Sequence, residues 1–302
     1  MKIKKWISGN YSWIITAILF LAVILQSGYK IGEEQIKVWD ESSGARGAVA
    51  MMINDDYLVV RNNGAPDHFD TKPPLAMWVK VISYKIFGIN EFSVRFPTLI
   101  SVILTALLLI FFLGIYQKKI WLANVLLIIM ACTPGYMGYH VARHGDPDTL
   151  LTFFTTSYSI LFFILLDKYP VSRIKYLILS TLFLVLAYYT KSIAWLAPAA
   201  GLVAYTLTRK NGYKLLLDYR LYLAGISSLL IIGLYYFLRN IYDEGFLHAV
   251  YRQEFLIINN YPGTPKHPES EFYINYLWNK ALKPFAYYAP IAIIPLLFGK
   301  DK

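Results

Sequence analysis

The sequence has little of what a cross-linked secreted domain or a metal-clustered protein needs. It holds one cysteine, Cys132, inside an apolar stretch. A single cysteine excludes an internal disulfide framework and a thiolate metal cluster, so Cys132 is expected to fill a small space in the core. Charged residues are also scarce. They make up 16% of the chain, whereas soluble domains average about 25%.

The chain is instead rich in apolar residues, which points to an all-α protein that crosses a membrane several times. Hydrophobic residues make up 57% of the sequence and the mean hydropathy is +0.44. The first apolar run is long enough to cross a ~30 Å hydrocarbon core. No small-residue cleavage site follows a short apolar region, so it is predicted to be a retained span and not a signal peptide. The apolar runs cover residues 11–29, 96–116, 120–138, 149–166, 177–207, 221–238 and 285–298.

The run 177–207 decides the predicted topology. As one helix it would be about 46 Å long, which is too long for a single crossing without strong tilt. Lys191 and Ser192 interrupt it at its centre. We therefore predict a short hairpin with Lys191 at its tip, which gives about eight membrane helices.

The distribution of charge supports that count. With the N-terminus in the cytoplasm, the segments on that side hold 14 Lys and Arg against 3 acidic residues, and the remaining positions hold 15 against 16. This is the positive-inside pattern, so the net charge of +10 reflects topology and anionic lipid headgroups, with no nucleic-acid partner. The cytoplasmic segments are 1–10, 117–119, 167–176, 208–220 and 299–302. The chain is then one membrane domain, 1–302, with two large extracytoplasmic loops, 30–95 and 239–284.

The first of these loops carries the strongest candidates. Asp40 and Glu41 follow the first span closely, and a carboxylate at the lipid boundary can act as a general base toward a hydroxyl. The alternative is a solvated acidic pair. Lys72 precedes Pro73 and Pro74, which hold the backbone extended and would present the cation to an anionic group. The alternative is a turn before a helix at 75–87.

Further charged residues lie on the same predicted side. Arg143, Asp146 and Asp148 share a short polar connection with His144. Asp148 could cap the following helix, since Asp is a favoured N-cap residue, and Arg143 could anchor the interface. Lys191 at membrane depth is costly unless it is paired or functional, which favours a functional role.

The loop 239–284 gives a weaker signal. His248, Arg252, Glu254 and His267 could hold a divalent metal or contact substrate, but their spacing matches no compact ligand motif. No other cofactor is predicted. The turn-rich stretch 261–265 is typical of a gating loop.

Cations and carboxylates at lipid depth outside the cytoplasm predict chemistry on a lipid-linked phosphate, because nucleotide sugars are not available there. A carboxylate would deprotonate an acceptor hydroxyl, which attacks the anomeric carbon. Lys and Arg would stabilise the departing polyprenyl phosphate. A single displacement predicts inversion. A flippase of lipid-linked sugars and a non-catalytic membrane scaffold are the alternatives. Internal repeats would favour the flippase, and we find none.

Three motifs, in order, resemble the GT-C membrane glycosyltransferases. They are WDE at 39–41, FDTKPPL at 69–75 and ARHGDPDTLL at 142–151. The most similar groups are the protein O-mannosyltransferase-like enzymes and the lipid A aminoarabinose transferases. The resemblance covers about residues 10–280. It implies a bacterial inner-membrane enzyme with a polyprenyl-phosphate-sugar donor and a lipid, glycan or protein acceptor.

The resemblance also implies roles for single residues. The catalytic Asp falls on Asp40, and phosphate contacts fall on Lys72 and Lys191, while Glu254 and His267 take a weak metal or substrate role. Asp148 is a second catalytic candidate. The remaining substrate-binding candidates are Glu41, Arg46, Arg143 and Asp146. The chain departs from the aminoarabinose transferases in reading Asp-Glu-Ser-Ser in place of Asp-Glu-Thr-Arg at 40–43, where Arg46 is expected to substitute. The family is also usually longer, which predicts a fragment or a short form.

Overall fold

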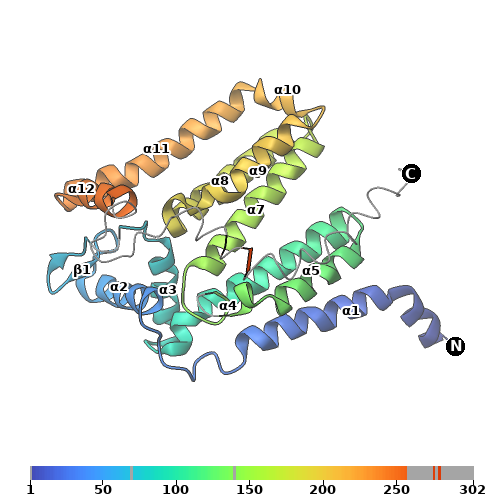
Figure 1. Cartoon of the computed structure of the whole chain (residues 1–302), viewed down its shortest axis with the longest axis horizontal. Helices are drawn as coiled ribbons and strands as arrows, with labels where there is room; N and C mark the ends of the chain where they lie inside the picture. Colours follow the sequence, from blue (N-terminus) through green and yellow to red (C-terminus); the bar gives the residue numbers. More distant parts are fainter. Residues whose placement is uncertain (1, 69–70, 139–140, 257–274, 276–277, 280–302) are drawn as a thin grey trace. The chain divides into compact units, whose positions relative to one another are not determined.

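The computed structural model describes residues 2–68, 71–138, 141–256, 275 and 278–279, and it divides into two units, 1–251 and 252–302. The described part of the first unit is almost entirely helical (Figure 1). Its elements are α1 (Lys2–Gly28), α2 (Asp40–Asn54), β1 (Arg61–Asn62), β2 (Ala65–Pro66), α3 (Leu75–Phe87), α4 (Glu91–Leu109), η1 (Ile110–Tyr116), α5 (Ile120–Cys132), α6 (Pro134–Met137), α7 (Asp148–Asp167), α8 (Arg173–Lys191), η2 (Ser192–Trp195), α9 (Leu196–Leu207), α10 (Gly212–Leu216), α11 (Tyr219–Tyr242) and α12 (Phe246–Tyr251).

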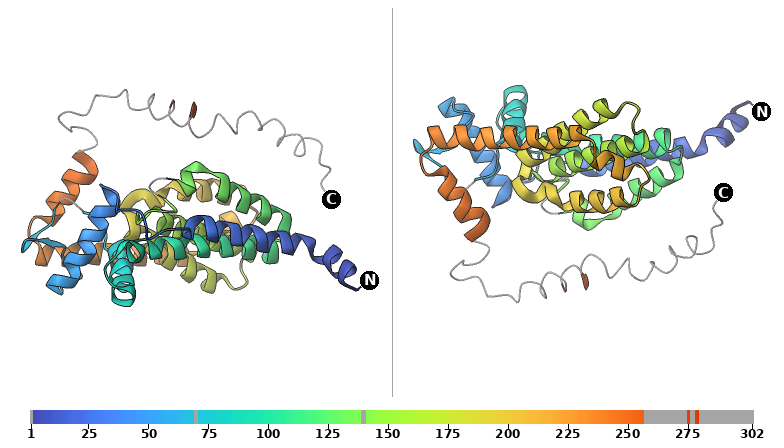
Figure 2. Two further views of the ribbon diagram at one scale, coloured as in Figure 1. Left: turned by 90° about the horizontal axis from the view of Figure 1, so that it is seen from below. Right: turned by 90° about the horizontal axis from the view of Figure 1, so that it is seen from above.

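Long apolar helices confirm the predicted all-α polytopic membrane protein. Among the described residues, five segments are long and apolar enough to cross a bilayer: 11–28, 91–116, 148–167, 173–207 and 219–242. Their outward faces carry large apolar side chains, such as Leu21 on α1 and Leu229 on α11, which are 54% and 70% exposed. Both views of Figure 2 show α1 lying alongside α4 and α5, on which it packs. Exposed faces of this composition suit lipid as solvent.

The segment 173–207 forms the predicted hairpin, although by length and composition it counts as one apolar run. The helix breaks at Ser192, whose φ of 47° lies in the left-handed region. Beyond the break the Tyr158 hydroxyl donates to the Trp195 carbonyl, and the Phe163 and Tyr205 rings stack 5.6 Å apart. α9 therefore returns along α7, antiparallel to α8. The count of eight stays a prediction, because 285–298 lies outside the described residues.

Two local expectations were wrong. The predicted span 120–138 ends early, since α5 stops at Cys132 and a short turn of helix, α6, begins at Pro134. Proline disfavours helical backbone in the residue before it, here Thr133, whose ψ is 112°. Cys132 does not fill the core: it is exposed at the end of α5.

The predicted cytoplasmic connections gather at one end of the bundle. The Tyr116 hydroxyl donates to Asp167 at 2.6 Å, and Arg173 lies 3.7 Å from Asp218. Asn211 also donates to the carbonyl of Leu166. These contacts join the segments after η1, α7 and α9, as the charge pattern predicts. Asp148 begins α7, at the end of that helix opposite Asp167. Asp40 begins α2 and Lys72 precedes α3, both within the connection between α1 and α4.

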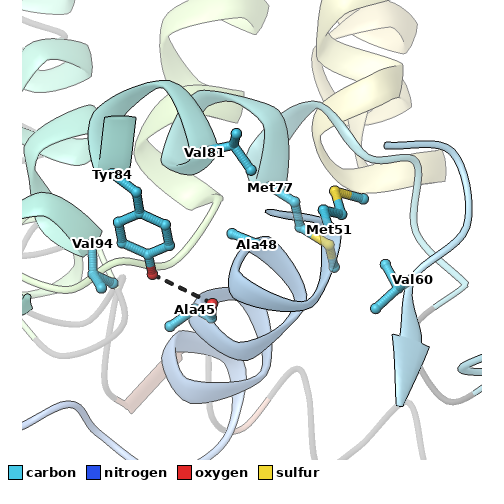
Figure 3. Packing of buried hydrophobic residues seen from close by; sticks show 8 residues of the cluster. All are labelled: Ala45, Ala48, Met51, Val60, Met77, Val81, Tyr84 and Val94. Atoms are coloured by element: carbon cyan, nitrogen blue, oxygen red, sulfur yellow. Dashed lines mark hydrogen bonds between the residues drawn. The ribbon is translucent and has the colours of Figure 1, made fainter. Parts of the chain in front are cut away.

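The loop 30–95 is a folded layer. The predicted helix at 75–87 is confirmed as α3, and α2 packs against it through a buried apolar cluster (Figure 3). β1 and β2 form a two-residue hairpin around Asn63 and Gly64, whose φ values are 52° and 81°. An Asn-Gly pair with two positive φ angles is the preferred turn of such hairpins. The cluster comprises Ala45, Ala48, Met51, Val60, Met77, Val81, Tyr84 and Val94.

The second unit is described only in part. It begins with the π-helical turn η3 (Arg252–Leu256). The predicted gating stretch 261–265 and His267 lie outside the described residues.

Candidate active site

Asp40 and Lys72 come together at the start of α2. The Lys72 ammonium nitrogen lies 4.0 Å from Asp40 Oδ1, and the two side chains are 38% and 36% exposed. The two candidate residues of the first loop are therefore neighbours in space. Trp39, just before Asp40, has a φ of 98°, a strained value for a residue with a side chain. The Ser42 hydroxyl accepts from the Trp39 N–H and so caps the strained turn.

Glu41 is buried and engaged on both oxygens. Its carboxylate accepts from Arg95 Nε at 2.7 Å and from Arg95 Nη2 at 3.1 Å, and both side chains are 1% exposed. It also accepts from the backbone N–H groups of Lys37 and Gly145, each at 2.7 Å. Arg95 directs its remaining donors to the carbonyls of 31, 34 and 35. These contacts tie the start of α2 to the segments around Lys37, Arg95 and Gly145. The predicted substrate contact of Glu41 remains untested.

The electrostatics of Glu41 follow from these contacts. Burial alone raises the pKa of its carboxyl, but the hydrogen bonds from Arg95, Lys37 and Gly145 outweigh burial and lower the pKa below its usual range. Gly145 has no room for a side chain, because a Cβ there would lie 2.5 Å from Val94 Cγ1 and 3.3 Å from Glu41 Cγ. The connection before α7 is therefore pinned to the start of α2.

Arg143 fixes the same connection to the first span. Its Nη1 and Nη2 donate to the carbonyls of Gln26 and Tyr29 at 2.8 and 3.0 Å. Cations suit the carbonyl end of a helix, and Tyr29 follows the last residue of α1. Arg143 thus caps the end of α1. This is similar to the alternative given above, in which Arg143 anchors the chain at the membrane interface. Its predicted substrate contact remains untested.

Asp148 and Lys191 form a second pair. Lys191 Nζ lies 2.7 and 2.9 Å from the two Asp148 carboxylate oxygens, and the side chains are 26% and 31% exposed. Asp148 is the first residue of α7 and Pro147 occupies the N-cap position, so Asp148 does not act as the N-cap. The hairpin lysine is paired, as a lysine at this depth requires. Asp148 is three residues from Gly145, so its Cα lies within about 11 Å of the Gly145 Cα.

Arg46 lies further along α2 and is 59% exposed, with Nη2 3.5 Å from the buried Asp67 carboxylate. It is available at the surface, as a substitute for the missing arginine requires. Its predicted phosphate contact remains untested.

Asp146 is buried, 3% exposed, and lines a small cavity with Lys80 and Pro147. The cavity volume is about 10 Å³, enough for no more than a single water molecule. Lys80, a buried lysine of α3, reaches the start of α2: a Cβ on Gly44 would lie 2.7 Å from its Nζ. Glycine at position 44 therefore makes room for a buried cation one turn after Asp40.

The metal prediction stays a prediction. Within the described ranges, no three His, Cys, Asp or Glu side chains gather closely enough to share a metal ion. Glu254 belongs to the second unit, and His267 lies outside the described residues.

The sequence analysis did not predict four features of the structure. They are the buried Arg95, the buried Lys80, the tight packing at Gly145, and a cluster of His68, Arg239 and Asp243. Arg95 could have been found. It lies in the first turns of an apolar span, where the argument applied to Lys191 holds equally. The other three depend on contacts between segments far apart in the sequence.

Two known proteins are similar to this chain in sequence. In sequence, the chain is 27% identical over 241 residues to an uncharacterised protein of Aquifex aeolicus, covering 79% of the chain and 45% of that protein. It is 26% identical over 195 residues to undecaprenyl phosphate-alpha-4-amino-4-deoxy-L-arabinose arabinosyl transferase of Aeromonas salmonicida, covering 62% and 34%. The chain thus spans less than half the length of these relatives.

In structure, the chain resembles ArnT from Cupriavidus metallidurans. The apo form gives a TM-score of 0.68 at 19% identity, covering 94% of the chain and 50% of ArnT. The form bound to undecaprenyl phosphate gives 0.66 at 18%, covering 96% and 51%. The fold is therefore that of a GT-C polytopic membrane protein. The sequence profile of the dolichyl-phosphate-mannose-protein mannosyltransferases matches residues 71–236, more than half of the chain. The chain belongs to the dolichyl-phosphate-mannose-protein mannosyltransferase family.

Proposed function

We propose that this chain holds the donor-binding and catalytic residues of a membrane glycosyltransferase. The enzyme moves a sugar from a polyprenyl-phosphate donor to an acceptor hydroxyl or phosphate. The observation that carries the proposal is the pair Asp40 and Lys72, an accessible carboxylate and an accessible ammonium 4.0 Å apart. The displacement needs a base for the acceptor hydroxyl and a cation for the departing phosphate, and this pair supplies one group of each kind. Family membership and the ArnT structure bound to undecaprenyl phosphate support the class of donor.

The residues divide the work as follows. Asp40 takes the proton of the acceptor hydroxyl as its oxygen attacks the anomeric carbon. Lys72 and Lys191 stabilise the negative charge that builds on the departing phosphate, and Asp148 positions Lys191. A single displacement inverts the anomeric centre. Glu41, Arg95 and Arg143 hold the segments that carry these groups.

The proposed site faces the extracytoplasmic side of a bacterial inner membrane. Basic residues concentrate in the connections at the opposite end of the bundle, which is the end expected to face the cytoplasm. The acceptors that the resemblance implies are a lipid, a glycan or a protein. No step of the proposed reaction passes through a metal.

Binding of undecaprenyl phosphate by the purified protein in lipid nanodiscs tests the proposal. We expect Lys72→Ala and Lys191→Ala each to weaken binding about tenfold or more, since each removes a charge-assisted contact. Lys85→Ala is the matched control, because Lys85 is an exposed lysine on the neighbouring helix α3. Equal affinity of all three variants and the wild type would contradict the assignment of the phosphate site.

A product assay separates the enzyme from a carrier. With an undecaprenyl-phosphate sugar and its acceptor, an inverting transferase releases undecaprenyl phosphate and forms a product of opposite anomeric configuration, which NMR distinguishes. Tight donor binding without release, for every donor and acceptor offered, would favour the flippase.

A further inference from the structure

The end of α11 is joined to the first loop through a buried ionic cluster. Arg239 and Asp243 lie one helical turn apart and are 1% and 0% exposed, with Arg239 Nε 3.1 Å from Asp243 Oδ2. Arg239 Nη1 also donates to the Leu58 carbonyl at 2.9 Å. The guanidinium lies over the Phe246 ring, 4.4 Å from its centroid. Removing one partner of a buried ion pair leaves an uncompensated charge, so loss of either Arg239 or Asp243 would be costly.

The other oxygen of Asp243 reaches back to the first loop. His68 Nε2 lies 2.6 Å from Asp243 Oδ1, across 175 positions of sequence. A carboxylate that already accepts from an arginine is ionised and can only accept, so His68 Nε2 carries a proton and donates it. The His68 side chain is 41% exposed, so its remaining ring atoms face away from the buried cluster.

The position of His68 in the chain gives this contact a consequence. Asp67 is held by Asn62 at 2.6 Å and by Arg46 at 3.5 Å, and Lys72 follows four residues after His68. Four residues of chain reach at most about 14 Å, and Pro73 and Pro74 stiffen the far side of Lys72. The contact of His68 with Asp243 therefore restrains the chain within four residues of Lys72.

We propose that His68, held by the buried Asp243, is a positioning residue that fixes the segment carrying Lys72 so that the lysine meets the donor phosphate. That Lys72 meets a donor phosphate rests on the proposed function. The anchoring contact between His68 and Asp243 does not. A tie that served stability alone would leave donor affinity unchanged in every variant that folds.

The test measures undecaprenyl phosphate binding by the full chain in nanodiscs. His68→Asn is too short to reach Asp243, while the amide nitrogen of His68→Gln takes the place of Nε2. We expect His68→Asn to weaken binding about tenfold, since a hydrogen bond to a charged group is lost, and His68→Gln to stay within about threefold of wild type. Lys85→Ala removes an exposed side chain of α3 and should bind as the wild type does.

A double-mutant cycle decides whether His68 acts through Lys72. In a Lys72→Ala background, His68→Asn should add nothing, because the group that it positions is gone. A full tenfold loss in that background, or wild-type affinity of His68→Asn alone, would overturn the proposal.

Hydrogen exchange without ligand keeps the two claims distinguishable. The amides of Thr71 and Lys72 should exchange faster in His68→Asn than in the wild type, and His68→Gln should restore protection. No change in exchange would overturn the anchor. Responsive exchange in a wild type that binds no undecaprenyl phosphate would overturn the proposed function and leave the anchor standing.

Discussion

Two neighbouring carboxylates, Asp40 and Glu41, have opposite surroundings. Glu41 is 1% exposed and accepts hydrogen bonds of 2.7–3.1 Å from Arg95, Lys37 and Gly145. Asp40 is 36% exposed and lies 4.0 Å from Lys72. The buried pair ties three segments together, and the accessible pair is left where a substrate can reach it. An acidic dipeptide can thus provide a structural joint and an accessible carboxylate in consecutive positions.

The largest expected effect comes from breaking the buried pair. Removing one partner leaves an uncompensated buried charge, so Arg95→Ala should lower the free energy of unfolding by about 3–5 kcal/mol. Thermal or denaturant unfolding in detergent measures it. Lys30→Ala is the control: it breaks an ion pair of 2.8 Å that is 52% and 63% exposed and should change stability by less than about 1 kcal/mol. Equal effects from both substitutions would contradict the contrast.

Crowding at Gly145 tests the same joint from the connection before α7. Gly145→Ala places a methyl group 2.5 Å from Val94 Cγ1 and against Glu41, so it should cost about 1–3 kcal/mol. Gly201→Ala, on α9, is a matched control because a Cβ at Gly201 has nothing within 4 Å. A stable Gly145→Ala variant would show that the joint is looser than the distances indicate.

Acid should remove the stabilising contribution of Glu41. Its pKa is lowered on folding from the ordinary value of 4.5, so its stabilising contribution is fully present above that value and is lost as the pH falls through the lower, folded pKa. We expect the unfolding temperature of the wild type to drop at pH values below about 4.5. Glu41→Gln should be less stable at neutral pH and lose less on acidification. Parallel pH curves would contradict the assignment.

The smallest expected effect on stability belongs to the second accessible pair. Asp148→Asn weakens a contact between side chains that are 31% and 26% exposed, so it should change the free energy of unfolding by about 1 kcal/mol or less. The same variant should lower affinity for undecaprenyl phosphate by misplacing Lys191. A large loss of stability with unchanged affinity would show that Asp148 stabilises the fold, as Glu41 does, and does not position Lys191 for the phosphate.

Much of the fold follows from the sequence because apolar periodicity and charge distribution are local properties. The hairpin at Lys191 and the helix Leu75–Phe87 were both predicted, and both are present. Asp40 and Lys72 were both named as candidates from the sequence, and the structure brings their side chains to 4.0 Å. The role of Glu41 did not, because its burial depends on Arg95 and Gly145, which lie 54 and 104 positions away. Contacts of such long range, like that of His68 with Asp243, leave no mark in the local pattern.

Asp40 is the residue on which the proposed chemistry depends most directly. The decisive measurement is release of undecaprenyl phosphate from a panel of undecaprenyl-phosphate sugars, comparing the wild type with Asp40→Asn in the same nanodiscs. We expect the wild type to turn over at least one donor, and Asp40→Asn to bind it with similar affinity while turnover falls about 10²–10⁴-fold, the range for loss of a general base. Turnover by Asp40→Asn at the wild-type rate would contradict the account.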